Sequence, residues 1–181
     1  MRLFSSACAV AVLVLSGCAS TPPAPPVSLI NSLSFDNPMT GKRDGLRSAW
    51  PLHSLAGSSE RFPLAQVRQC DAAGVCSWGV LDAQRSFGKV TPVEGGVEVE
   101  LDLLVNVDRR QQVARAEQNG GMTIPADVAA LEAKRRVQRT LTLPFGKVES
   151  IALDFGIRFE LCAFRLDGAG KPLEQCALPY F

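Results

Sequence analysis

Few side chains in this sequence could perform catalysis. His53 is the only histidine among the 181 residues, so a Ser-His-Asp or Cys-His mechanism would have to use it. Ser54 and Ser58 lie close to it in the chain, but no Gly-x-Ser-x-Gly motif accompanies them. A single histidine also disfavours an imidazole-rich metal site. The sequence therefore predicts no catalytic residue, no metal site and no cofactor, and we expect that the protein is not an enzyme.

Three carboxylates, those of Glu98, Glu100 and Asp102, alternate with apolar residues in one stretch. A glycosidase uses a pair of carboxylates, one on each side of the glycosidic bond that it hydrolyses. A carboxylate at every second position is instead typical of the solvated outer face of a β-strand. We interpret these residues as an acidic surface.

The N-terminal segment has the features of a bacterial export signal. Arg2 is its lone charge, and the apolar core from Phe4 to Leu15 is shorter than the about 20 residues of a membrane span. Leu15-Ser16-Gly17-Cys18 resembles the lipobox of bacterial lipoproteins. The resemblance implies cleavage before Cys18, acylation of its thiol and new N-terminus with chains such as palmitate, and stable membrane attachment.

The same resemblance implies a location. In Gram-negative lipoproteins an Asp after the lipidated Cys favours the inner membrane, so Ala19 favours the outer membrane, with the protein facing the periplasm. Pro-rich residues follow, which are typical of a stiff spacer. We expect a signal peptide at residues 1–17, a lipidated Cys and Pro-rich tether at 18–26, and a single periplasmic β domain at 27–181.

Four cysteines remain once Cys8 and Cys18 are set aside. An even number in an exported protein predicts two disulfides. Turn residues separate the members of each close pair, so each pair would meet across a hairpin. Redox and zinc chemistry are the alternatives, but neither pair has the spacing that such sites need. The predicted disulfides are Cys70–Cys76 and Cys162–Cys176.

Charge is balanced overall but not locally. Without Arg2 the chain has equal numbers of basic and acidic side chains, which disfavours a nucleic-acid partner. Residues 109–139 carry a basic excess that would suit anionic headgroups, an acidic protein or an anionic polysaccharide. The alternative is a solubilising loop. We name as the basic patch Arg109, Arg110, Arg115, Lys134, Arg135, Arg136 and Arg139.

Apolar alternation predicts a mainly β fold. Its clearest examples are Val97–Val107 and Val137–Leu143, and Val27–Phe35 would be the first strand. We expect a small antiparallel β-sandwich or barrel, or else an antiparallel sheet with one helix across a face. Residues 36–60 are predicted to form a loop. Further predicted strands are Phe62–Cys70, Cys76–Leu81, Phe87–Val93, Glu149–Ala163 with a bend at Gly156, and Leu173–Phe181.

The basic excess lies in a long excursion between two neighbouring strands. Pro125 to Arg136 has the composition of one short helix, with Thr123 as a possible cap. If the flanking strands pair, the basic residues at both ends of the excursion meet at one end of the domain.

These features predict a non-catalytic binding or assembly module of the cell envelope, attached to the outer membrane through its lipid anchor and bound to a protein partner there. The alternative is an inhibitor of a periplasmic hydrolase such as a lysozyme. Because lysozymes are typically basic, an inhibitor would use the acidic strand with Glu98 and Glu100 and not the basic patch.

Overall fold

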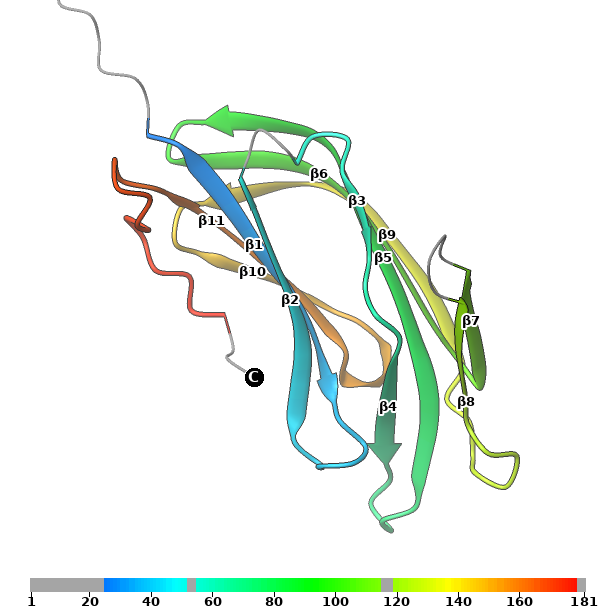
Figure 1. Ribbon diagram of the computed structural model, residues 1–181. Coiled ribbons are helices and arrows are strands. Elements are labelled where there is room, and N and C mark those ends of the chain that lie inside the picture. Colours follow the sequence, from blue (N-terminus) through cyan, green and yellow to red (C-terminus); the bar gives the residue numbers. More distant parts are fainter. Residues whose placement is uncertain (1–24, 52–54, 115–118, 179–181) are drawn as a thin grey trace, which may run out of the picture.

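The computed structural model describes residues 25–51, 55–114 and 119–178 and is mainly β. Two antiparallel sheets face each other as in a sandwich (Figure 1). The β1 sheet has the strand order β10 (Val148–Ala152), β11 (Arg158–Arg165), β1 (Val27–Asp36) and β2 (Arg43–Pro51). The β6 sheet contains β3 (Ser59–Arg61), β4 (Ala65–Cys70), β5 (Cys76–Val93), β6 (Gly96–Asp108) and β9 (Ala133–Pro144).

A small third sheet pairs β7 (Arg110–Ala114) with β8 (Asn119–Thr123) and lies beside the β6 sheet (Figure 1). No helix in the described part of the chain is long and apolar enough to cross a membrane.

The core lies between the two large sheets. Alternate residues of β6 from Val97 to Val107 are buried, as their period of two predicts. The β1 sheet contributes Leu29, Leu33 and Phe159, and Phe159 packs edge-to-face on Phe62 with ring centroids 6.4 Å apart. The predicted strands that became β1, β6 and β9 are confirmed.

One long strand replaces two predicted ones. The sequence predicted separate strands at Cys76–Leu81 and Phe87–Val93, but β5 runs unbroken and accommodates a bulge between Phe87 and Val90. The Glu100 carboxylate accepts the Lys89 backbone N–H at 2.9 Å and fills the space beside Gly88, where a Cβ would lie 2.6 Å from Glu100 Oε2. A Cβ at this position would therefore displace the Glu100 carboxylate from the bulge.

The predicted loop at 36–60 contains the edge strand β2. Its backbone pairs with β1 in antiparallel register from Asp36–Arg43 to Ser28–Pro51. The connecting turn is held by Asn37, whose Oδ1 accepts the N–H groups of Met39 at 2.8 Å and Thr40 at 3.3 Å. Polar residues therefore build a turn and a strand here, so the expectation of a loop was wrong.

Two other expectations about strands were also wrong. Glu149–Ala163 is not one strand bent at Gly156 but a hairpin, because Phe155 and Gly156 take positive φ values of 57° and 72° and reverse the chain. After β11 no strand forms in the described residues up to 178. Only the antiparallel bridge between Leu166 and Pro172 appears there.

The short helix predicted at 125–136 does not form. This segment instead turns at 126–128 and then bonds to the start of β5. Trp78 donates its N–H to Ala129 O at 2.9 Å, and Leu131 donates to Trp78 O at 2.8 Å. Tertiary backbone pairing and burial of Leu131 in the core therefore override the weak local helix propensity.

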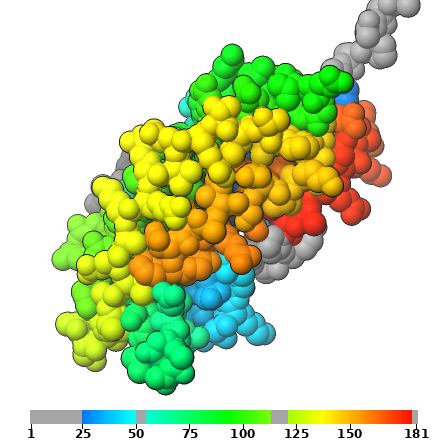
Figure 2. Space-filling view, turned by 180° about the vertical axis from the view of Figure 1, so that it is seen from behind, coloured from blue at the N-terminus to red at the C-terminus, as the bar shows by residue number. Residues whose placement is uncertain are grey.

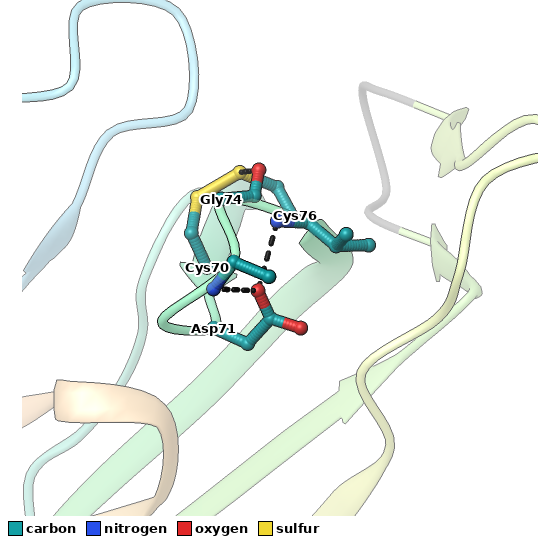
Figure 3. The surroundings of a disulfide bond; sticks show 6 residues. Cys70, Asp71, Gly74 and Cys76 are labelled. Atoms are coloured by element: carbon teal, nitrogen blue, oxygen red, sulfur yellow. Dashed lines mark hydrogen bonds between the residues drawn. A yellow bond between two sulfur atoms is a disulfide. The ribbon is translucent and has the colours of Figure 1, made fainter.

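Both predicted disulfides are confirmed. Cys70–Cys76 closes the β4–β5 hairpin, where Asp71 Oδ1 accepts the N–H groups of Ala73 and Val75, each at 2.9 Å (Figure 3). Cys162–Cys176 ties the segment after β11 to the outer face of the β1 sheet, where Leu178 packs on Ile30 and Cys162. The second bridge thus gives this face a small core of its own.

Candidate functional site

The described members of the basic patch, apart from Arg139, lie toward one end of the β6 sheet. Asn106 of β6 pairs with Lys134 of β9, and Val107 pairs with Ala133. Because β6 ends at Asp108, Arg109 and Arg110 follow at the same end as the start of β9. Arg115 lies outside the described residues, as do Cys18 and His53.

Arg109 has a structural role. Its guanidinium donates to Pro125 O at 2.5 Å and to Val128 O at 3.0 Å, so it holds the turn that leads the chain back toward β9. Both acceptors are backbone carbonyls far along the chain, so no sequence pattern could have paired them with this side chain.

Two arginines of β9 form ion pairs with neighbouring strands. Arg136 binds the Asp102 carboxylate through Nε at 2.9 Å and Nη2 at 2.5 Å. This hydrogen bonding is the main reason that the pKa of Asp102 lies below its ordinary value. Arg139 Nη2 lies 3.3 Å from Glu149 Oε1 of β10. Exposed ion pairs contribute little to stability, but they reduce the charge offered to a partner.

Three basic side chains keep their charge available. Lys134, Arg135 and Arg110 are exposed, and within the described ranges none of them makes a hydrogen bond or an ion pair. Lys134 and Arg135 are consecutive on β9, so they project from opposite faces of the strand. The positive charge at this end of the domain is therefore concentrated on the start of β9.

The backbone of β9 belongs to the same surface. β9 is the last strand of its sheet, and all of its residues pair with β6 on one side only. Alternate residues of such a strand direct N–H and C=O groups away from the sheet. Sequence reasoning missed this feature, because the position of a strand in a sheet is set by pairings remote in the chain.

The acidic strand face is largely engaged within the domain. Asp102 binds Arg136 and also accepts Gln138 Nε2 at 3.0 Å, and Glu100 accepts the backbone of the β5 bulge. Glu98 is exposed and makes no such contact among the described residues. This face therefore offers much less free negative charge than its sequence suggested.

No cluster of three or more metal-binding side chains occurs in the described part of the chain. Comparisons with protein-family models, curated proteins and solved structures gave no match.

Proposed function

We propose that this chain is an outer-membrane lipoprotein facing the periplasm, which acts as a non-catalytic binding or assembly module and contacts an acidic protein partner through β9. The observation that carries the proposal is the pair Lys134 and Arg135, which are exposed at the start of an edge strand and whose side chains have no partner among the residues that the structure describes. The Leu15-Ser16-Gly17-Cys18 motif supplies the anchor.

The direction of β9 supports a protein partner over the headgroups of the anchoring membrane. Phe145, just after β9, bridges to Ala163, which pairs with Leu29 near the start of β1. The chain thus enters the domain beside the end of β9, and β9 begins at its opposite end (Figure 1). Lys134 is the second residue of β9. At about 3.3 Å per residue, the strand sets the basic residues some 30 Å from that entry point.

The lipid anchor can be tested by the substitution Cys18→Ala. We expect the variant to lose the mass increment of the acyl groups and to leave the outer-membrane fraction, with its β-sheet circular dichroism unchanged. Intact-mass spectrometry and membrane fractionation measure both effects, and Cys8→Ala is the matched control that should behave as the natural sequence does. Membrane retention of Cys18→Ala without any fatty-acid increment would contradict the anchor.

The contact surface can be tested by placing a photo-crosslinking amino acid at Lys134 and, in a second protein, at Glu98. Both sites are exposed and lie on the same sheet, but one is basic and the other acidic. We expect irradiation of intact cells to give a specific protein adduct from position 134 and none from position 98. The combined substitution Lys134→Glu and Arg135→Glu should remove the partner, as judged by a crosslinker placed at the nearby Gln138.

The opposite pattern would reverse the interpretation. An adduct from position 98 alone, identified by mass spectrometry as a peptidoglycan hydrolase, would replace the assembly role with an inhibitor role. No adduct at either position would contradict both surfaces.

A further inference from the structure

We infer that β9 binds its partner by strand addition: an extended acidic segment of the partner pairs with the free edge of β9 and continues the β6 sheet. This inference rests on the proposed function and specifies the chemistry and the geometry of the same contact. It brings together two features of β9, its regular unpaired backbone and its run of positive charge.

The regularity of β9 distinguishes it from most other edges. Its twelve residues pair with β6 without any register shift, and no proline precedes Pro144. The opposite side of the β6 sheet is formed by β3 and β4, with three and six residues, and the outer strand β10 has five. Short strands and bulges are the usual means of blocking an edge, and β9 has neither.

Charge distinguishes β9 from the remaining long edge. β9 carries Lys134, Arg135, Arg136 and Arg139 and no carboxylate. The nine-residue β2 mixes its arginines with Asp44. Charges on an edge oppose self-association, because two copies of β9 would place like charges side by side. An acidic strand avoids this repulsion and places opposite charges across the new strand pair. The edge therefore selects a partner segment of negative charge.

The positions of the charges define the segment that fits. Lys134 and Arg136 project from the face that carries Asp102, whereas Arg135 and Arg139 project from the other face. A matching strand therefore needs acidic residues at consecutive positions, so that both faces are neutralised.

The first half of β9 is open to such a strand. The β10 strand, which follows a short turn, pairs only with β11, and its Glu149 reaches β9 at Arg139. Space-filling Figure 2 shows the yellow segment that includes β9 along the near surface of the molecule, with no other segment laid across it. An added strand would lie alongside residues 133–138.

A capped synthetic peptide, Thr-Glu-Glu-Asp-Val-Thr-Glu-Val-Thr, is a suitable probe, with two analogues that are N-methylated at alternate residues. One analogue loses the N–H groups on one edge of the peptide, and the other analogue loses those on the opposite edge. We expect one analogue to bind about tenfold or more weakly than the parent and the other to bind within about twofold of it. Amide hydrogen exchange should show new protection of alternate residues of β9.

Matched charge variants complete the test. Arg135→Glu should weaken parent-peptide binding by about tenfold or more, whereas Arg158→Glu, the same change at an exposed position of β11 in the other sheet, should alter it by less than about twofold. Equal binding of both methylated analogues would overturn strand addition while leaving a charge-based contact, and with it the proposed function, intact. Failure of the parent peptide to bind at about 1 mM would also overturn strand addition, whatever the crosslinking at position 134 shows.

Discussion

Replacement of Arg85 by alanine is expected to lower the free energy of unfolding by about 3–5 kcal/mol. Arg85 belongs to the inner face of β5 and is fully buried between the sheets. Its Nη2 lies 2.5 Å from Glu60 Oε2, its Nη1 donates to Ser58 Oγ at 3.4 Å, and its guanidinium carbon lies 4.5 Å from the ring centroid of Phe87. Burial lowers the pKa of Arg85, but the guanidinium stays charged.

The large expected loss of stability has two causes, an unpaired carboxylate and a cavity. The Glu60 carboxylate would lose its partner, and a cavity would form beside Phe87, so that both electrostatic and packing terms act in the same direction. Urea unfolding followed by circular dichroism measures the change.

Two variants make this measurement decisive. Arg136→Ala also removes an arginine from a carboxylate, but the Arg136 side chain is 58% exposed, so its loss should be much smaller. Arg85→Met combined with Glu60→Gln removes both charges and keeps the volume, and should recover part of the stability. A loss from Arg85→Ala as small as that from Arg136→Ala would show that burial does not govern this ion pair.

Removal of the Cys162–Cys176 disulfide is expected to cost about 3 kcal/mol. The bridge closes a loop with a sequence separation of 14, compared with 6 for Cys70–Cys76. Because the longer loop loses more chain entropy when it is closed, the double substitution of Cys70 and Cys76 by alanine should cost less, about 2 kcal/mol. Denaturant titration of the two double variants tests this order.

Removal of each disulfide should also destabilise a different part of the domain. Without Cys162–Cys176 the segment around Leu178 loses its covalent link to β11, and its packing on Ile30 alone holds it in place. We therefore expect faster amide exchange in β11 and new protease cleavage after residue 166. Without Cys70–Cys76, exchange should rise only around the β4–β5 turn. An equal stability loss in both variants, with cleavage after residue 166 in neither, would contradict this account.

Local patterns in the sequence predicted the parts of the fold that depend on neighbouring residues. The alternation from Val97 to Val107 fixes both the strand and its buried face, and turn residues between the paired cysteines bring them together. The strand β2 was missed because its residues alternate weakly and its hydrogen bonds come from β1. The helix expected after Pro125 fails for a related reason, since its backbone bonds to Trp78.

For the candidate surface too, the sequence predicted what depends on local pattern and missed what depends on contacts between distant residues. Residue types and spacing were enough to find the basic patch, but not to separate its engaged members from its available ones. The partner of Arg136 is Asp102 on β6, and the partners of Arg109 are carbonyls of Pro125 and Val128. Only the strand order reveals that Lys134 and Arg135 stand on an open edge.

The turn of Phe145, Gly146 and Lys147, which carries the chain from β9 in one sheet to β10 in the other, has a mechanical consequence. A partner held at Lys134 and a membrane attached before Val27 would pull on opposite ends of the domain. Tension on β9 then acts along its axis, so the ladder with β6 is loaded in shear and its bonds resist together. If both attachments hold, the load passes from the far end of β9 through β10 and β11 to β1, across antiparallel ladders that would be loaded in shear.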